Sequence, residues 1–307
     1  MASSNKIDKV AIFNQWLGTV ADDMNFRFGS NDRLGTANYI DRAARLRAAM
    51  CIEVGDAVSL ARPLVEGPGF HTETTFDSTG QYGFDTIESA CHGYSKTHMD
   101  ALNHVASSGG TFYGGRVLDG NELPNAVDLA SRCLFTRALF ADIPAVRGTT
   151  WVSANKPVTG ADIDAALSGV EVLPGDALVL YMGRDRWEAA GHALGTEPGH
   201  ARSAAGNVPA KKPGAGRDAA RWIVEHRISV LSWDFLDAVD DPGAPSEAKG
   251  SVHRLLPTAG LIVIDNCKLS SASALMRCLN RRVAAIIASP LAVPNGTGSI
   301  VTPWLMV

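Results

Sequence analysis

The stretch RDAARWIVEHRISVLSWDF, residues 217–235, decides the fold class because its hydrophobic period changes halfway along. Residues 217–227 place apolar side chains at helical spacing with charged ones between them, which predicts a helix. The continuation ISVLSWDF predicts a strand. Further along, LIVID at 261–265 and VAAIIASPL at 283–291 are continuously apolar, as is typical of strands covered on both faces. Helices and strands interleaved in this way predict an α/β protein.

The remaining segments extend this pattern toward the N-terminus. Helices are predicted over 41–50 and from Thr159, whose hydroxyl can accept from the backbone N–H of Asp162. A short strand is predicted over 57–60, and VEVLPGDALVLYMG at 170–183 predicts two strands around a Pro-Gly-Asp turn. Residues 65–83, rich in Gly, Thr, Phe and Asp, are expected to form a loop. The Gly/Ala/Pro-rich residues 191–216 predict a long insertion that serves as a lid or an oligomer contact.

Composition limits the classes of partner. The chain has 307 residues, 46% of them hydrophobic and 20% charged, enough to bury a full core in one large domain or two ordinary ones. The net charge of −4 gives no electrostatic footprint for nucleic acid. The only concentration of basic residues is predicted to be a solvated loop, and its members are Arg202, Lys211, Lys212 and Arg217.

The cysteines and the N-terminus bear on the cellular compartment. Five cysteines at irregular spacings argue against a disulfide framework and for a reducing environment. The start MASSNKIDKV lacks the apolar core of a signal peptide, and no apolar run reaches membrane-spanning length. The protein is therefore expected to be soluble and cytoplasmic, with a small-molecule substrate and no membrane partner.

The candidate site lies in HGYSKTHMDALNHV, residues 92–105. A strand over THMD would aim His98 and Asp100 from one face, and imidazole plus carboxylate suits Zn²⁺ or Mn²⁺. His104 comes within reach if the chain turns after Leu102. Each histidine alone is more typical of a partly buried, hydrogen-bonded side chain. Their clustering around a carboxylate favours a metal site with a spare histidine beside it, which is the minimal set for activating water.

A second group of polar residues follows the later strands. Asp265 ends the LIVI run, and a carboxylate there is costly unless it is paired, although a turn cap is the favoured interpretation. His253 follows a loop. Asp234 and Asp237 end another strand, where a role as turn residues and a role in a site are equally supported.

Several segments, in order, resemble the metal-dependent cyclase family, which includes bacterial kynurenine formamidase and isatin hydrolase. THMDALNH at 97–104 is similar to the family's HxGTHxDxPxH signature. Five further segments resemble family segments: NDRLGTANYID at 31–41, VLPGDALVLYMGRDRW at 172–187, DAARWIVEHRISVLSWD at 218–234, IDNCKLS at 264–270 and PLAVPNGTGSIVTPW at 290–304.

The resemblance implies roles for particular residues. His98 and Asp100 match the metal-binding histidine and aspartate, and His104 matches the histidine that acts as, or near, the general base. His253 and Asp265 have the spacing of a further histidine and glutamate of the formamidase site, with aspartate one methylene shorter.

The signature also departs from the family at three positions. Tyr94 stands where the family has its first histidine, Lys96 replaces a glycine and Leu102 a proline. His92, two residues before Tyr94, could supply the missing ligand from the same face of a strand, or could be structural.

The function implied is a metal-dependent hydrolase that uses a metal-activated water, on Zn²⁺ or Mn²⁺, to open a cyclic amide, an imide or an N-acyl C–N bond. A lactone hydrolase, a ring-closing lyase and a non-catalytic binding relative are the alternatives. Residues expected to contact a flat substrate, with ordinary core or rim positions as the alternative, are Trp16, Phe28, Phe76, Tyr82, Tyr94 and Lys96.

The family's fold is a layered β/β/α structure of swivelling-domain type, usually assembled as a homo-oligomer. The resemblance therefore implies an N-terminal extension with a helix over 1–50, expected to contact a neighbouring subunit, and a cyclase-like hydrolase domain over 51–307. A homodimer or homotetramer is expected.

Overall fold

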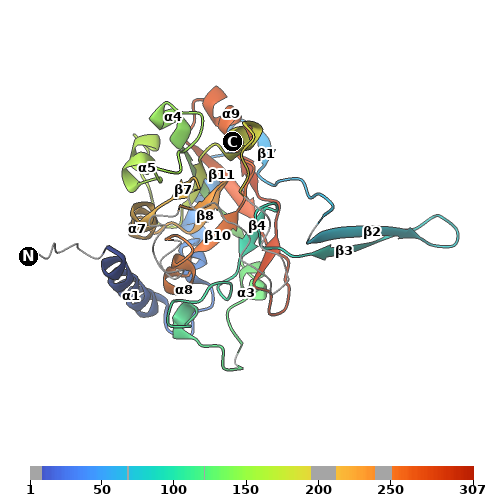
Figure 1. Ribbon diagram of the computed structural model, residues 1–307, viewed down its shortest axis with the longest axis horizontal. Helices are drawn as coiled ribbons and strands as arrows, with labels where there is room; N and C mark the ends of the chain where they lie inside the picture. Colours follow the sequence, from blue (N-terminus) through green and yellow to red (C-terminus); the bar gives the residue numbers. More distant parts are fainter. Residues whose placement is uncertain (1–8, 68, 121, 195–211, 239–250) are drawn as a thin grey trace, which may run out of the picture.

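The computed structural model describes residues 9–67, 69–120, 122–194, 212–238 and 251–307 (Figure 1). Their centre is a curled, mixed sheet of nine strands. In spatial order the strands are β1 (Ala57–Ser59), β13 (Trp304–Met306), β11 (Val283–Ala288), β5 (Leu134–Asp142), β6 (Ala177–Tyr181), β8 (Val230–Trp233), β10 (Ile262–Asp265), β4 (His98–Asp100) and β12 (Gly298–Ile300). The α/β class predicted from the sequence is confirmed.

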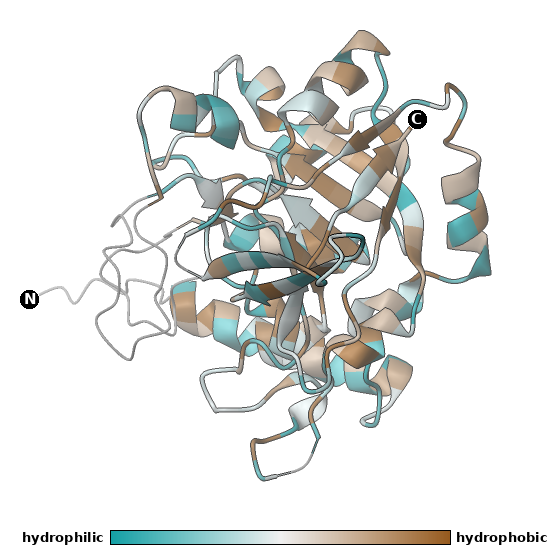
Figure 2. Cartoon of the chain, turned by 90° about the vertical axis from the view of Figure 1, so that its right-hand side faces the viewer, coloured by the Kyte–Doolittle hydropathy of each residue, from teal (hydrophilic) through white to brown (hydrophobic). Residues whose placement is uncertain are grey.

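The middle of the sheet is parallel and the two sides are antiparallel. Strands β5, β6, β8 and β10 run in one direction, and every other neighbouring pair is antiparallel. All residues of β6, β8 and β10 are buried, which explains their continuously apolar sequences. Figure 2 shows these central strands mostly in the hydrophobic colour.

Helices cover the sheet from outside (Figure 1). Contacts to β5 come from α2 (Arg42–Ala49) and α5 (Gly160–Ala166), α4 (Ile143–Arg147) contacts β6, and α7 (Arg217–Glu225) packs on α5. The remaining helices are α3 (Ala126–Ala130), α6 (Arg184–Ala189), α8 (Leu255–Ala259), α9 (Ser270–Cys278) and two short 3₁₀ turns, η1 (Gly35–Tyr39) and η2 (Tyr113–Gly115). Thr159 caps α5 by accepting from the backbone N–H of Asp162, as predicted.

The first helix, α1 (Lys9–Phe28), joins the same core as the sheet. Its buried residues Phe13, Leu17, Val20 and Met24 recur every three or four positions and form one stripe. The helix packs against α8. Contact of this N-terminal region with a neighbouring subunit stays a prediction, as do the boundary at residue 50 and the β/β/α swivelling arrangement.

One predicted loop is wrong. Residues 70–89 form a hairpin of β2 (Phe70–Phe76) and β3 (Gly83–Ser89), which projects from the body (Figure 1). All residues of the two strands except Phe70 are exposed. The sequence signal was missed because apolar and polar residues do not alternate there, as they do in a strand with one face on a core. Threonine and aromatic residues nevertheless favour extended backbone.

Two other predictions need correction. Residues 170–173 are not a strand; there the Asp176 carboxylate accepts from the backbone N–H of Leu173 and pairs with Arg137, which builds a turn before β6. Of the predicted insertion, residues 195–211 lie outside the described part of the chain. Lys212 is only 6% exposed and is not in a solvated loop. It precedes a small parallel pair of strands, β7 (Gly214–Ala215) and β9 (Leu236–Asp237).

Two further sequence expectations concern the whole chain. All five cysteines are free, which confirms that no disulfide framework is present. Among the helices that the structure describes, none combines the length and the apolar character needed to cross a bilayer.

Candidate metal centre

Strand β4 places the two central residues of the site. It lies between β10 and β12, so that Asp265 is opposite His98 and Gly298 is opposite Asp100. His98 and Asp100 are two residues apart and point to the same face. Their side chains are almost completely buried, and His98 Nε2 lies 3.5 Å from Asp100 Oδ1. The predicted strand and the convergence of these two side chains are confirmed.

Asp100 is the centre of the cluster. Both of its carboxylate oxygens are buried, and neither has a donor in hydrogen-bonding geometry in the described chain. Oδ1 faces His92 Nδ1 at 3.1 Å as well as His98. Oδ2 faces His253 Nε2 at 3.6 Å and His104 Nε2 at 3.9 Å. Four imidazoles, three from residues 92–104 and one from His253, therefore surround one carboxylate.

Two groups within this cluster have the composition and spacing of a metal site. The first is His92, His98 and Asp100; the second is Asp100, His253 and Asp265. In each group one ligand atom per residue lies within 4.8 Å of the others. Ligands bound tetrahedrally to Zn²⁺ are separated by about 3.3 Å. The distances from 3.1 to 3.8 Å across the cluster are close to that value, so the residues fit a divalent ion.

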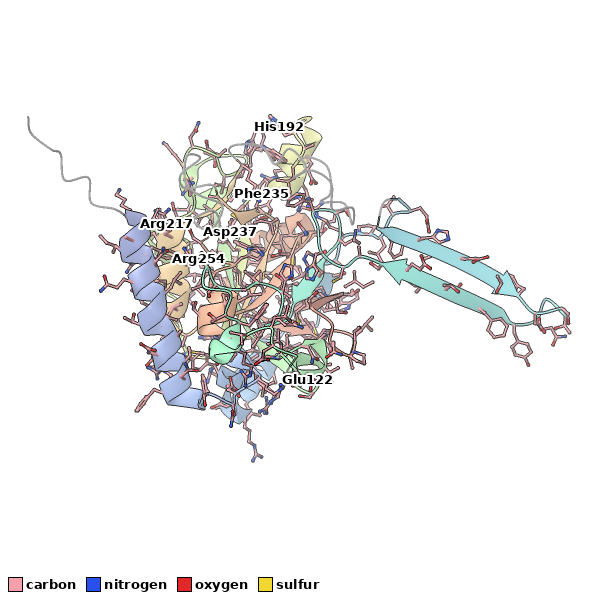
Figure 3. All side chains as sticks on the ribbon, turned by 60° about the horizontal axis from the view of Figure 1, so that its bottom comes forward. Glu122, His192, Arg217, Phe235, Asp237 and Arg254 are labelled. Atoms are coloured by element: carbon pink, nitrogen blue, oxygen red, sulfur yellow. The ribbon has the colours of Figure 1, made fainter. Side chains whose placement is uncertain are left out.

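Outer partners orient the donor atoms. His98 Nδ1 lies 2.9 Å from the backbone oxygen of Lys96, which leaves Nε2 for the site. His253 Nδ1 is hydrogen-bonded to Asp237, and its Nε2 lies 3.1 Å from Asp265 Oδ2. Such carboxylate or carbonyl partners fix the tautomer and the ring orientation of metal-binding histidines. The donor atoms of the cluster are thus held in place by their hydrogen bonds; Figure 3 labels Asp237, the partner of His253.

Asp265 has a further partner of its own. The indole Nε1 of Trp233 on β8 donates to Asp265 Oδ1, which leaves Oδ2 directed at the imidazoles of His253 and His98. Asp265 is therefore not a turn cap, and neither is Asp237. Sequence reasoning missed the roles of Trp233 and Asp237 as orienting partners. The only signal was their position at or after the end of a buried strand.

His92 enters from the loop before β4. Its Nε2 lies 2.9 Å from Thr297 Oγ1, and its ring stacks on His104 at 3.7 Å and 6°. Gly298 leaves the room for this ring, because a Cβ at that position would lie 2.8 Å from His92 Cε1. His92 therefore reaches the cluster from a loop and not from the face of a strand, and its role as a replacement for the missing signature histidine stays a prediction.

The electrostatics keep Asp100 charged and His104 neutral. Burial alone would raise the pKa of Asp100, but the surrounding imidazoles, with His104 first, hold that pKa well below its usual range. Burial and the charges of His92 and His253 lower the pKa of His104 to about 4, against the attraction of Asp100. Burial favours the neutral form of His92, but the Asp100 carboxylate outweighs this effect. Together with Cys91 it raises the pKa of His92 to about 9.

Burial and neighbouring carboxylates also act in opposite directions on the pKa of His253. Burial opposes the charge on His253, but the charges of Asp265 and Asp237 and their hydrogen bonds raise its pKa well above the usual value. Burial likewise opposes ionisation of Asp237, and the nearby His253 nonetheless lowers its pKa. The cluster thus carries ionised carboxylates facing imidazoles, the donor set that divalent cations such as Zn²⁺ accept.

Tyr94, at the signature's first position, lies beside the cluster and in neither metal-binding group. Its backbone oxygen accepts from Arg184, and its ring has the Lys212 ammonium 5.3 Å from the centroid. Tyr94 also lines a cavity of about 710 Å³, together with Arg62 and Arg184. Lys96 is buried, and its Nζ lies 3.4 Å from Ser95 Oγ, so it is not a charge on an exposed strand edge.

The four remaining aromatic candidates lie elsewhere. Trp16 stacks on Phe13 of the same helix, and the Phe28 ring packs edge-on against Tyr39, both at 5.3 Å. Two others, Phe76 and Tyr82, are 66% and 65% exposed on the projecting hairpin, so they do not wall the cluster of their own chain. Their contact with a substrate stays a prediction.

Comparison with known proteins adds a family and a fold. A sequence profile described as "Putative cyclase" matches residues 48–240. No curated protein matches the sequence. A crystal structure described as a novel cyclase superposes with a TM-score of 0.74 at 22% identity, covering 93% of this chain and 97% of its own.

Two isatin hydrolases also superpose. Isatin hydrolase A from Labrenzia aggregata, bound to benzyl benzoate, gives a TM-score of 0.56 at 17% identity and covers 85% of this chain and 95% of its own. An isatin hydrolase bound to the product analogue thioisatinate gives a TM-score of 0.55 at 18% identity. The match covers 84% of this chain and 94% of the hydrolase chain. At these identities the likeness establishes a shared fold.

Proposed function

Because the chain belongs to the cyclase family, we propose that its histidine–aspartate cluster holds a divalent metal, Zn²⁺ or Mn²⁺, in a metal-dependent hydrolase. The single observation that carries this proposal is Asp100, a buried ionised carboxylate that faces four imidazoles and has no donor in hydrogen-bonding geometry among the described residues. Burying such a charge is expensive unless a cation or several donors compensate for it. A metal ion between Asp100 and the facing imidazoles is the compensation that this donor set offers.

The proposed ligands form two groups that share Asp100. His92 and His98 face one carboxylate oxygen, whereas His253 and Asp265 lie on the side of the other. Because the two groups share Asp100, the cluster could hold one ion in either group or one ion in each. His92 then replaces the ligand that the family places at the position of Tyr94.

A divalent ion bound there would lower the pKa of a water from 15.7 to about 7 and polarise a carbonyl group. The residues supply the proton transfers. His104 Nε2 is 3.9 Å from Asp100 Oδ2, and its side chain is 28% exposed, so it borders both the ligands and the solvent. We assign it the role of accepting a proton from the attacking water and returning it to the leaving nitrogen.

The substrate that we propose carries a cyclic amide, an imide or an N-acyl C–N bond. The support is the fold shared with two isatin hydrolases, one of which holds a product analogue named thioisatinate. A lactone hydrolase or a ring-closing lyase would use the same residues. Tyr94 in place of the signature histidine favours a non-catalytic binding protein as the second candidate, and metal content separates that candidate from the hydrolase.

We also propose that the protein assembles as a homodimer or homotetramer. The hairpin of β2 and β3 supports this, because a two-stranded hairpin without a covered face is marginally stable in water. Its exposed apolar side chains, which need a partner surface, are Phe76, Tyr82, Phe84 and Ile87. A second copy of the chain is the partner that a family of homo-oligomers offers.

The experiment combines metal analysis with a substrate screen. Purified protein is dialysed against Zn²⁺ or Mn²⁺, and its metal content is measured by atomic emission before hydrolysis of isatin, cyclic imides, N-formyl anilides and lactones is assayed. We expect at least one ion per chain and turnover that a chelator abolishes. Protein that binds no metal under these conditions would overturn the proposal and favour the binding relative.

A further inference from the structure

Lys212 is a buried cation beside the cluster. The side chain is 6% exposed, and its ammonium lies 5.3 Å from the centre of the Tyr94 ring, which faces it as a cation–π partner. Asp237 and Asp265 are close enough to act on its charge, but it forms no ion pair with a carboxylate of the described residues. An ammonium in this position has lost most of its water without gaining a salt bridge to any residue that the structure describes.

The backbone fixes the position of this lysine. Lys212 and Pro213 lead directly into β7, which pairs in parallel with β9. The approach is so close that a Cβ on Gly214 would lie 2.2 Å from the backbone oxygen of Leu236. Since β9 also carries Asp237, the partner of His253, the lysine and the cluster are held by the same two strands.

The neighbouring cations differ from Lys212, because their charges are already matched. Arg62 pairs with Asp185 at 3.1 Å and with Glu188 at 3.0 Å. Arg184 pairs with Glu188 at 2.7 Å. These arginines line the cavity of about 710 Å³ that Tyr94 shares. Lys212, on the ring of the same tyrosine, is a buried cation whose charge has no direct anionic partner among the described residues, whereas Lys268, which also lines the cavity, is exposed to solvent.

Burial works against the charge of Lys212. It lowers the pKa of the ammonium, and Arg184 lowers it further, while Asp237 and Asp265 act in the opposite direction. Keeping an unpaired cation at such a position is unfavourable for the empty protein. An anion that binds beside the ammonium offsets this free-energy cost. The position therefore prefers anionic ligands to neutral ones.

We propose that the Lys212 ammonium binds a carboxylate of the substrate while the scissile carbonyl of the same molecule lies at the histidine–aspartate cluster. This inference rests on the proposed hydrolase function and narrows its substrate class to amides or imides that carry a carboxylate nearby. Tyr94 lines the cavity, and its ring faces the Lys212 ammonium, so it links the cavity to the proposed carboxylate site.

Hydrolysis of a matched pair of substrates tests the inference. N-formylanthranilate and N-formylaniline differ by one carboxylate, and each is assayed with metal-loaded wild type, Lys212→Met and Lys212→Arg. A hydrogen bond between charged groups contributes about 1.5–3 kcal/mol. Lys212→Met should therefore lower the kcat/KM for N-formylanthranilate, relative to that for N-formylaniline, by roughly 10- to 100-fold. Lys212→Arg keeps most of the preference, and the exposed Lys156→Met serves as a surface control.

A role limited to neutralising Asp237 and Asp265 predicts a different result. Both substrates would then slow by the same factor in Lys212→Met, metal content would fall, and the ratio would stay unchanged. That outcome overturns the inference. An unchanged rate for both substrates also overturns it.

Ligand binding distinguishes failure of the inference from failure of the proposed hydrolase. Calorimetric titration of metal-loaded protein with benzoate and with benzamide needs no turnover. Weaker binding of benzoate alone in Lys212→Met supports the carboxylate site even if no amide is hydrolysed. Equal benzoate affinity in wild type and Lys212→Met overturns it, because the carboxylate is then held elsewhere, for instance by the metal.

Discussion

The strands of the cluster and the strands of the hairpin reverse the usual relation between polarity and burial. β4 has three residues, two of them ionisable, and is completely buried. β2 and β3 have seven residues each, include four aromatic or aliphatic side chains, and are almost entirely exposed. The difference arises from position in the fold, because β4 has a neighbour on both sides and the hairpin has none in the nine-stranded sheet.

The contrast indicates what each region lacks within a single chain. The cluster has a buried carboxylate that faces four imidazoles but has no donor in hydrogen-bonding geometry among the described residues, so the partner that we propose for it is a cation. The hairpin has satisfied strand pairing but uncovered apolar side chains, so its missing partner is a surface. Substitutions in the cluster should therefore change metal content, and substitutions in the hairpin should change assembly.

The largest effect is expected for Asp100→Asn, which removes the charge shared by both metal-binding groups with almost no change in shape. Metal content should fall below one-tenth of an ion per chain, and turnover should fall by roughly 10³-fold or more as the activated water is lost. The metal-free variant should unfold at a lower temperature than metal-free wild type, because the imidazoles that hold the pKa of Asp100 low stabilise its charge in the folded protein and this stabilisation is lost. Emission spectrometry and thermal unfolding measure both, and full metal content in this variant would falsify the assignment of Asp100.

His104→Ala should separate binding from catalysis. Metal content is expected to stay at the wild-type value while kcat falls by roughly 10²- to 10⁴-fold, the usual contribution of a general base. His71→Ala, which removes an exposed histidine of the hairpin, is the matched control and should leave both quantities unchanged. Loss of metal together with activity would make His104 a ligand instead of a base.

Phe84→Ser and Ile87→Ser test the other side of the comparison. Their registers place them on opposite faces of the hairpin, since Phe84 pairs with Thr75 and Ile87 with Thr72. We expect the double variant to fall to the mass of one chain in light scattering, with metal content preserved. The single variants identify which face is covered. An unchanged mass for the double variant would remove the hairpin from the interface.

Gly298→Ala should have the smallest effect on the cluster. The new Cβ would lie 2.7 Å from the Met99 backbone oxygen and 2.8 Å from His92 Cε1, so β4 and the ring must both shift; metal affinity should fall by roughly 10-fold, with about 1–3 kcal/mol lost in stability. Gly18→Ala is the control, because nothing lies within 4 Å of its added methyl group and it replaces a glycine inside a helix. That variant should gain up to about 1 kcal/mol. Unaltered metal affinity in Gly298→Ala would contradict close packing of His92 and β4 around a bound ion.

Much of the framework was predictable from local sequence. The continuous apolar runs at 261–265 and 283–291 became β10 and β11, and the period of 217–227 became α7. The spacing of His98 and Asp100 predicted their convergence, because a strand alternates its side chains whatever surrounds it. The hairpin was missed because its strands pack on no core and so carry no alternation of polarity.

The sequence by itself determined the α/β class, the strand that aims His98 and Asp100 together, and the histidines available near them. It could do so because these properties depend on backbone geometry over a few neighbouring residues. Only the tertiary structure decided that Asp265 faces the cluster and is not a cap, that Asp237 and Trp233 orient its donors, that His92 stacks on His104, and that Lys212 is buried. These outcomes depend on strand order and on contacts between distant segments, which no local pattern encodes.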